Sequence, residues 1–173
     1  AVIVFCECSH LEFYEYENEI KKLVDHYLNF YDNVSIRNAV QSEHKGYGEA
    51  MIMREALSHI KEFKAQHIFK ISARYVLEDD FHFEDFHLRM NCFTLWDKCY
   101  HSYCTLFYKI HHHYIDSFYK CIDDHLSDLQ KGKCLEMIIG SYFPKYCKFH
   151  DIRIMEKIHV GGNLSTEGYY FSI

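Results

Sequence analysis

The chain opens with Val2-Ile3-Val4-Phe5-Cys6, a short apolar run with the pattern of a strand that is buried on both faces. Apolar side chains then recur at helical spacing, which predicts an amphipathic helix over about residues 13–31. A second strand is expected over 34–40 and a third over 67–71, with a helix between them that begins at Lys45. The first 75 residues are therefore expected to alternate β-α-β-α-β.

Strands joined by helices of this length are expected to be parallel, with right-handed connections. The sequence thus predicts an α/β fold with one Rossmann-like domain over residues 1–173. Its central sheet is expected to be mostly parallel and flanked by helices. Residues 1–75 form the nucleotide-binding half in this interpretation, and residues 76–173 form the other half.

The second half has a less regular pattern. Residues 76–100 are rich in acidic and aromatic side chains and are expected to be irregular. The other expected elements are a strand over 104–110, a helix over 114–129, a helix over 134–143 that Pro144 ends, and a strand over 152–160 that Gly161-Gly162 turns.

The composition excludes several classes of protein. Of the 173 residues, 49% are apolar and 17% aromatic, so the chain is neither disordered nor of low complexity. Its formal charge of −6 offers no overall basic surface for nucleic acid. The first apolar run is far too short to span a bilayer. The 14 His and 8 Cys are unusual. Several Cys lie within apolar patterns, so we expect buried free thiols and a reducing, cytosolic compartment.

In an open α/β sheet, ligands bind beyond the carboxyl ends of the strands, and four segments are expected there. The first is Glu7-Cys8-Ser9-His10, whose polar side chains suit a nucleobase or a ribose; an ordinary loop is the alternative. The second is Lys45-Gly46-Tyr47-Gly48-Glu49, at a helix N-terminus. Free N–H groups, a glycine and a cation suit a pyrophosphate or an acidic sugar. A loop with a solvated Lys45 is the alternative there.

The third segment is Lys70-Ile71-Ser72-Ala73-Arg74-Tyr75, at the end of the third expected strand. Alternation puts Lys70 and Ser72 on one side with Arg74 just beyond, and a lysine is not expected within an apolar strand unless it is paired. Two cations and a hydroxyl suit a phosphate-bearing ligand, which arginine can hold through two hydrogen bonds. Structural ion pairing with the acidic residues 78–80 is the alternative.

The fourth segment combines Glu136 with Gly161-Gly162-Asn163. Glu136 lies in an apolar helical pattern, where an unpaired acid is costly, and a half-buried acid of raised pKa can act as a general base. A solvent-facing glutamate is the alternative. The stretch Gly161-Gly162-Asn163 follows the last expected strand, at a place where it can wrap a substrate.

Several of these stretches together resemble a family of GT-A-like glycosyltransferases from viruses and from bacterial polysaccharide gene sets. The matching segments are Lys45-Gly46-x-Gly48-Glu49, Ile68-Phe69-Lys70-Ile71-Ser72-Ala73-Arg74-Tyr75, Thr105-x-Phe107-Tyr108, Glu136 and Gly161-Gly162. The resemblance covers most of the chain. It implies a GT-A-type fold, a UDP- or GDP-sugar donor, a glycan acceptor, and an acceptor and catalytic half over residues 76–173.

The resemblance also implies roles for individual residues. An inverting enzyme needs one carboxylate to deprotonate the acceptor hydroxyl, and Glu136 is the first candidate, followed by Asp79 and Asp80. The residues expected to bind the donor are Glu7, Cys8, Ser9, Lys45, Gly46, Glu49, Lys70, Ser72, Arg74 and Tyr75.

The chain departs from the family pattern at two points. Ala73 replaces an expected glycine. No Asp-x-Asp follows the third expected strand, where GT-A enzymes commonly hold Mn²⁺ or Mg²⁺ on the donor diphosphate. Lys70 and Arg74 would then neutralise the leaving diphosphate in place of a metal. The segment Glu78-Asp79-Asp80, with its hard oxygen ligands, is the fallback metal site.

Two alternatives to an active transferase stay open. One is a catalytically inactive domain of the same fold that binds a nucleotide sugar or a partner. The other is a metal-binding or redox module built on Cys6-x-Cys8 or His111-His112-His113. Neither segment has the ligand spacing of structural zinc sites, and consecutive histidines on a strand or helix are expected to point in different directions. The aromatic residues between 81 and 108 suit an acceptor groove or the face of a homodimer.

Overall fold

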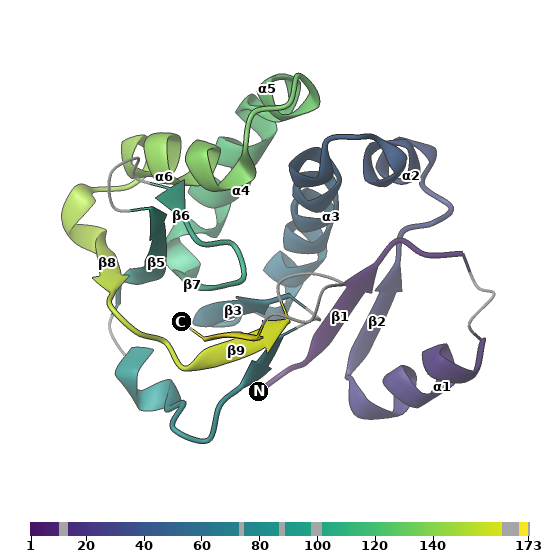
Figure 1. The fold of residues 1–173 in the computed structure, drawn as a ribbon, viewed down its shortest axis with the longest axis horizontal. Coiled ribbons are helices and arrows are strands. Elements are labelled where there is room, and N and C mark those ends of the chain that lie inside the picture. Colours follow the sequence, from purple (N-terminus) through teal and green to yellow (C-terminus); the bar gives the residue numbers. More distant parts are fainter. Residues whose placement is uncertain (11–13, 73–74, 87–88, 98–101, 164–169, 173) are drawn as a thin grey trace. The chain divides into compact units, whose positions relative to one another are not determined.

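A computed structural model describes residues 1–10, 14–72, 75–86, 89–97, 102–163 and 170–172 (Figure 1). The chain divides into two units. The first consists of Ala1–Phe63 and Asp123–Lys133, and the second of Lys64–Ile122 and Cys134–Ile173. Helices and strands are mixed in both units, so the expected α/β class is confirmed at that level.

The first unit contains a short parallel pair of strands with helices around it. Its elements are β1 (Val4–Glu7), α1 (Tyr14–Leu23), β2 (His26–Asn29), α2 (Val34–Gln41), α3 (Lys45–Ile60), the 3-10 turn η2 (Lys61–Phe63) and α5 (Leu126–Gln130). β1 and β2 run parallel and in register from Val4 opposite His26 to Glu7 opposite Asn29. The unit therefore begins with the β-α-β arrangement that the sequence predicts.

The helix expected over residues 13–31 is wrong in its second half, because β2 follows α1 there. The apolar positions of Tyr27 and Leu28 fit either a helix or a strand. The open hydrogen-bonding edge of β1 favours the strand, since pairing satisfies the backbone of both segments. The Asp25 carboxylate supports the turn into β2 by accepting from the Ile3 N–H at 2.8 Å.

The strand expected over residues 34–40 is also wrong, because this segment is α2. Asn33 caps the helix: its side-chain oxygen accepts from the N–H groups of Ser35 and Ile36 at 3.1 and 3.2 Å. Asparagine is among the best N-cap residues, so the cap outweighs the strand preference of the valines. The buried core of the unit comprises Phe30, Ile36, Ala39 and Met51.

The second unit is built on two sheets. Its elements are β3 (His67–Ile71), β4 (Tyr75–Leu77), η3 (Phe83–Phe86), β5 (Asn91–Asp97), β6 (Ser102–Tyr103), β7 (Phe107–His111), η4 (His112–Tyr114), α4 (Ile115–Asp124, of which 115–122 belong to this unit), α6 (Leu135–Tyr146), η5 (Phe149–Asp151), β8 (Ile152–Met155), β9 (Val160–Asn163) and β10 (Tyr170–Ser172).

The larger sheet has the strand order β3-β7-β5-β6, with β8 also beside β5. The pairs β3–β7, β7–β5 and β5–β6 are antiparallel, whereas β5–β8 is parallel. The smaller sheet, β10-β9-β4, is antiparallel. The expected mostly parallel sheet is therefore wrong for the described strands of this unit. The reason is the connection between β5 and β7, which is too short for a helical crossover and so joins antiparallel strands.

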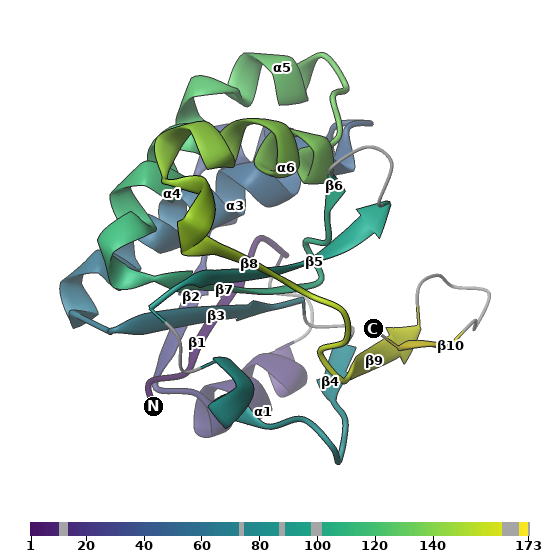
Figure 2. The same cartoon turned by 90° about the vertical axis from the view of Figure 1, so that its left-hand side faces the viewer.

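Aromatic side chains pack on both faces of the larger sheet. On one face, Phe93 of β5 lies 6.4 Å from Phe118 of α4 and 5.9 Å from Phe143 of α6, between ring centroids. These two helices cover that face (Figure 2). On the other face, Phe69 of β3 lies 6.0 Å from Phe107 of β7. The sheet is thus a rigid base for the polar groups at its strand ends.

Three expectations for the later part of the chain need adjustment. Residues 76–100 are not irregular throughout, since η3 and β5 lie there. The strand expected over 104–110 is confirmed as β7, moved to 107–111. The helix expected over 114–129 is divided into α4 and α5 at His125, whose backbone has the non-helical angles φ −115° and ψ 11°.

Pro144 and the glycine pair also differ from expectation. Pro144 lies inside α6 and does not end it. Proline has no N–H to donate to the carbonyl four residues earlier, so α6 continues for its last two residues without that hydrogen bond. Gly161 and Gly162 lie within β9, where they pair with β4 on one side and β10 on the other, so they do not form a turn. β8 and β9 are separate strands, and the expected single strand over 152–160 is wrong.

No helix in the part of the chain that the structure describes combines the length and the apolar character that a membrane crossing requires.

Candidate functional site

Lys70 lies in β3 with its half-buried side chain directed at polar groups. Its Nζ donates to Ser72 Oγ at 2.6 Å and to the backbone carbonyl of Thr105, and it lies 5.8 Å from the ring centroid of Tyr108. The Ser72 N–H donates to the Leu106 carbonyl at 2.9 Å, which fixes the strand end. A lysine in an apolar strand is thus paired, as its position in the sequence required.

Thr105 connects this lysine to Glu136. The hydroxyl Oγ1 of Thr105 donates to Glu136 Oε1 at 2.7 Å, while its carbonyl accepts from Lys70. Glu136 Oε2 accepts from the Cys134 thiol at 2.6 Å. We refer to Lys70, Ser72, Thr105, Cys134 and Glu136 as the Lys70–Glu136 network. It brings together three residues expected from the sequence, Lys70, Ser72 and Glu136.

The charges of Glu136 and Lys70 affect the pKa values of two nearby thiols, Cys134 and Cys104. Partial burial of the Cys134 thiol raises its pKa. The hydrogen bond to Glu136 and the charge of that carboxylate raise the pKa further. Burial raises the pKa of Cys104 to about 11, with Glu136 acting to raise it and Lys70 to lower it. A cation and an anion therefore act on the same small region, at the start of α6.

Glu78, Asp80 and His159 form a second polar cluster in the same unit. One ligand atom from each residue lies within 4.8 Å of the other two. His159 Nδ1 lies 2.5 Å from Asp80 Oδ2, and the Glu78 N–H donates to the His159 carbonyl at 2.9 Å. His159 has a φ of +55°, so the chain adopts a left-handed conformation between β8 and β9. Asp79 is exposed and lies outside this cluster.

The donor atoms of this cluster fit a divalent cation. Two carboxylates and one imidazole supply hard oxygen ligands with a single nitrogen, a set that suits Mn²⁺ better than soft metals. Lys157 Nζ lies 3.9 Å from Asp80, so part of the carboxylate charge is already balanced. The expected metal residue Asp80 belongs to the cluster, and its partners there are Glu78 and His159.

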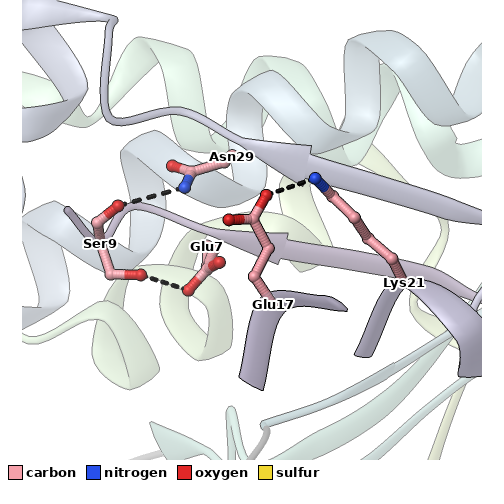
Figure 3. A network of polar contacts seen from close by, with 5 residues as sticks. All are labelled: Glu7, Ser9, Glu17, Lys21 and Asn29. Atoms are coloured by element: carbon pink, nitrogen blue, oxygen red, sulfur yellow. Dashed lines mark hydrogen bonds and ion pairs between the residues drawn. The ribbon is translucent and has the colours of Figure 1, made fainter. Parts of the chain in front are cut away.

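A pocket of about 190 Å³ lies at the carboxyl end of β1 in the first unit. Ser9 Oγ donates to the Glu7 carboxylate, Asn29 Nδ2 donates to the Ser9 carbonyl at 3.1 Å, and Glu17 of α1 accepts from Lys21 (Figure 3). The residues that line the pocket are Glu7, Ser9, His10, Tyr16, Glu17, Ile20 and Tyr27. Of the expected segment, Glu7, Ser9 and His10 line it.

Two polar atoms at this pocket lack partners. Glu17 Oε2 and the Tyr27 hydroxyl are shielded from solvent, and no described residue forms a hydrogen bond with either. Buried polar atoms without partners are costly, so a hydroxyl-bearing ligand would gain by pairing with them. Cys8 is half-buried and packs against the core of the unit. Its pKa is raised by burial, with Arg37 lowering it and Glu7 raising it.

The segment from Lys45 to Glu49 opens α3 as expected. Lys45 is exposed at the helix N-terminus, and His44 before it makes no side-chain capping bond. Gly48 has a structural role instead of a ligand-binding one: a Cβ there would lie 2.8 Å from Val40 Cα, so the glycine lets α2 and α3 approach. Gly46 and the half-buried Glu49 lie in the first turns of the same helix.

The remaining expected residues are less informative. Arg74 lies outside the described residues, and the side chain of Asn163 is not among those described. Tyr75 is 8% exposed and belongs to the hydrophobic core of the second unit, which indicates a packing role. Gly161 and Gly162 are buried in β9.

The three consecutive histidines gather at one point, contrary to expectation. Ring centroids of His111, His112 and His113 lie 3.9 to 4.9 Å apart, and His67 lies 5.3 Å from His111. Burial, together with the neighbouring imidazoles and Lys109, lowers the pKa of His111 to about 4. His111 is therefore a neutral, buried imidazole at neutral pH.

Sequence reasoning missed Glu17, Tyr27, Asn29, Cys134 and His159. Tyr27, Asn29 and His159 lie far along the chain from the residues they meet, so no short motif joins them. Cys134 is only two residues from Glu136, but a lone cysteine in an apolar pattern gives no signal of that bond. One signal was available for His159: it interrupts the apolar pair Ile158 and Val160, where a polar residue needs a reason. Asn29 similarly ends an apolar strand.

Comparisons of the chain with protein-family models, with curated proteins and with solved structures found no match. The resemblance to glycosyltransferases therefore remains a hypothesis, and function is inferred from the side chains themselves.

Proposed function

We propose that this chain is a glycosyltransferase with a mixed α/β architecture. It would move a sugar from a UDP- or GDP-sugar to a glycan acceptor. The observation that carries the proposal is the Lys70–Glu136 network, in which Thr105 joins a cation to a carboxylate. Sugar transfer needs both charges: one to stabilise the leaving diphosphate and one to accept a proton from the acceptor hydroxyl.

In this proposal Lys70 acts as the electrostatic group. As the bond between the sugar and the diphosphate breaks, negative charge grows on the leaving oxygen, and a fixed ammonium nearby lowers the energy of that state. Ser72 and the Thr105 carbonyl hold the ammonium in place through hydrogen bonds. Because these bonds exist without ligand, the lysine needs no reorganisation when the reaction begins.

Glu136 is the proposed general base, with Asp79 and Asp80 as the other candidates. A base must accept the proton of the acceptor hydroxyl as that oxygen forms a bond to the anomeric carbon. Glu136 lies in the first turn of α6, and its side chain is half-buried. The charged carboxylate is the form that can accept the proton.

A divalent cation fits the cluster of Glu78, Asp80 and His159. When bound there, Mn²⁺ or Mg²⁺ would neutralise the charge of the donor diphosphate. The residues themselves supply two carboxylate oxygens and an imidazole nitrogen within 4.8 Å of one another. The absence of an Asp-x-Asp sequence is therefore no obstacle to metal dependence, because His159 supplies a ligand from a distant part of the chain.

The pocket of the first unit supports the proposal separately. Carboxylates that face a small cavity repel phosphate but accept hydrogen bonds from hydroxyl groups, as acidic residues do with ribose. Glu7 and Glu17 both line the cavity, and Glu17 Oε2 is without a partner there. These groups suit the nucleoside part of a donor.

One observation favours the second candidate, an inactive domain that binds nucleotide sugars. Both carboxylate oxygens of Glu136 already accept hydrogen bonds, from Thr105 and Cys134. Each oxygen keeps a second lone pair, so Glu136 acts as a base only if one of these faces the acceptor hydroxyl. In the inactive alternative the bonds persist and the network only supports the fold.

The first experiment is a thermal-shift screen of the whole chain with UDP- and GDP-sugars, with and without Mn²⁺. Ligand that binds the folded state must raise its stability, by about 2.7 kcal/mol at a concentration one hundred times Kd. We expect at least one donor to raise the Tm, and Asp80→Asn to reduce the effect of Mn²⁺. If no nucleotide or nucleotide sugar raises the Tm, both the transferase and the inactive binding domain are excluded.

A further inference from the structure

His111, His112 and His113 bring their ring nitrogens together where β7 ends. One nitrogen from each ring lies within 4.8 Å of the other two. The ring centroids of His112 and His113 are 3.9 Å apart, and that of His111 lies 4.4 and 4.9 Å from them. His111 is buried, whereas His112 and His113 are exposed, so the cluster can be reached from solvent.

A change of backbone conformation explains why consecutive side chains meet. His111 is the last residue of β7, with φ −78° and ψ 142°, and the 3-10 turn η4 begins at the next residue. On a continuous strand the three rings would alternate between faces. Here the turn folds back, and His111 Nδ1 accepts from the His113 N–H at 3.4 Å. Asn91 Oδ1 accepts from the His111 N–H at 2.9 Å and fixes the strand end.

The ring of His112 is oriented by the backbone of Gln66. The Gln66 carbonyl oxygen lies 3.0 Å from the His112 N–H and 3.3 Å from His112 Nδ1. A carbonyl only accepts hydrogen bonds, so Nδ1 carries the proton and Nε2 keeps its lone pair. In metal sites, a histidine ligand is commonly oriented by a hydrogen bond from its other ring nitrogen, the one that does not bind the metal, to a carbonyl or carboxylate. The bond from His112 Nδ1 to Gln66 is of this kind.

We propose that His111, His112 and His113 bind a divalent transition-metal ion such as Zn²⁺. The site is independent of the proposed transferase function. Ligands of a tetrahedral zinc at about 2.0–2.1 Å lie roughly 3.4 Å from one another. The three nitrogens reach that spacing through small rotations, which the exposed rings of His112 and His113 allow.

The ligand set selects the class of metal. Three imidazoles without a carboxylate suit Zn²⁺, Ni²⁺ and Cu²⁺, whereas Mg²⁺ and Ca²⁺ prefer oxygen. Three protein ligands leave a fourth position for water. The ammonium of the buried Lys109 acts on His111 and opposes a bound cation. An exchangeable ion is therefore expected, not a permanent structural one.

The test is a Zn²⁺ titration of the whole chain in competition with a chromogenic chelator. The variant is His112→Ala with His113→Ala, both at exposed positions. The matched control is His82→Ala with His150→Ala, two exposed histidines outside the cluster. We expect the His112 and His113 double variant to lose one equivalent of Zn²⁺ or to bind it at least tenfold more weakly, with the His82 and His150 control unchanged.

Two results would overturn the site: the double variant binds Zn²⁺ as the unaltered chain does, or the His82 and His150 control loses the same equivalent. A second measurement needs no variant. Zn²⁺ should protect His112 and His113 from diethyl pyrocarbonate, read on their peptide by mass spectrometry, while Mg²⁺ does not and the peptides with His82 and His150 react unchanged. Equal modification with and without Zn²⁺ contradicts the proposal.

Discussion

Thr105 links the two charges of the proposed site through its own side chain and backbone. Replacing it by valine keeps the shape but removes the hydroxyl that donates to Glu136 at 2.7 Å. We expect Thr105→Val to lower the free energy of unfolding by about 1 to 2 kcal/mol, because a bond to a charged group is lost. Urea denaturation of both proteins measures the difference.

Thr94 provides the matched control for this substitution. It is also buried in the second unit, but its Oγ1 has no hydrogen-bond partner among the described residues. Thr94→Val therefore removes a polar atom that gains nothing in the folded state, and stability should stay the same or rise. Equal losses for both variants would mean that the Thr105 hydroxyl makes no special contribution.

Cys134 reports the position of Glu136 through its pKa. Burial raises the pKa of this thiol first, and the hydrogen bond and charge of Glu136 raise it further. Glu136→Gln removes the charge, so the pKa should fall and the thiolate fraction at pH 8 should grow. Because the thiolate is the nucleophile, alkylation of Cys134 by iodoacetamide should become faster.

Peptide mass spectrometry measures that rate at Cys134 directly. Glu156→Gln, at an exposed carboxylate of the second unit, is the control and should leave the rate unchanged. A slower or unchanged rate in Glu136→Gln would show that this carboxylate does not face the thiol in solution.

Among the individual residues of the site, the sequence identified the charged side chains that lie within apolar patterns. Lys70 in an apolar strand and Glu136 in an apolar helix needed partners, and the structure supplies them through Thr105. Thr105 fits the strand expected over 104–110 and gives no such signal, and in the structure it lies in the bend between β6 and β7. His159 and Asp80 are far apart in the sequence, so only the folded chain reveals that they lie close together.

At the scale of elements, Gly48 controls how α2 and α3 pack. A Cβ at this position would lie 2.8 Å from Val40 Cα and 3.1 Å from the Ala39 carbonyl oxygen, and both are backbone atoms that cannot turn aside. We expect Gly48→Ala to force the helices apart and to cost about 1 to 3 kcal/mol. Thermal unfolding followed by circular dichroism measures the loss.

Gly46 in the first turn of α3 is the control for this substitution. It has no positive φ, so alanine fits its backbone, and alanine has the higher helix propensity. Gly46→Ala should leave stability unchanged or raise it slightly. A Gly48→Ala variant as stable as Gly46→Ala would contradict the close approach of the two helices.

Helices and strands with a clear apolar pattern in their own sequence could be predicted. Strands that form only because they pair with another strand could not. The helix from Lys45 and the strand over 67–71 follow from their apolar patterns. Residues 26–29 fit a helix by periodicity, and only the edge of β1 makes them a strand. The Asn33 cap of α2 is visible in the sequence, but the valines that follow it favour a strand, which is why a strand is expected over 34–40.

At the scale of the whole molecule, the division into two units was not readable from the sequence. The boundary at 122 lies within α4, and the segment 123–133 returns to the first unit. A continuous helical periodicity over 114–129 conceals it. The direction of the strands was equally hidden, because β5 lies in a stretch whose aromatic and acidic side chains have no strand alternation.

In the proposed function, the chain breaks the bond between a sugar and a nucleoside diphosphate. Release of UDP or GDP from donor sugars in the presence of Mn²⁺ measures this directly, since water can replace an unknown acceptor. We expect measurable release by the unaltered chain and a decrease of about a hundredfold in Lys70→Met, because an electrostatic group at the leaving oxygen is lost. The control Lys148→Met, at an exposed lysine, should match the unaltered chain. No release from any UDP- or GDP-sugar, or equal release by Lys70→Met, would contradict the account.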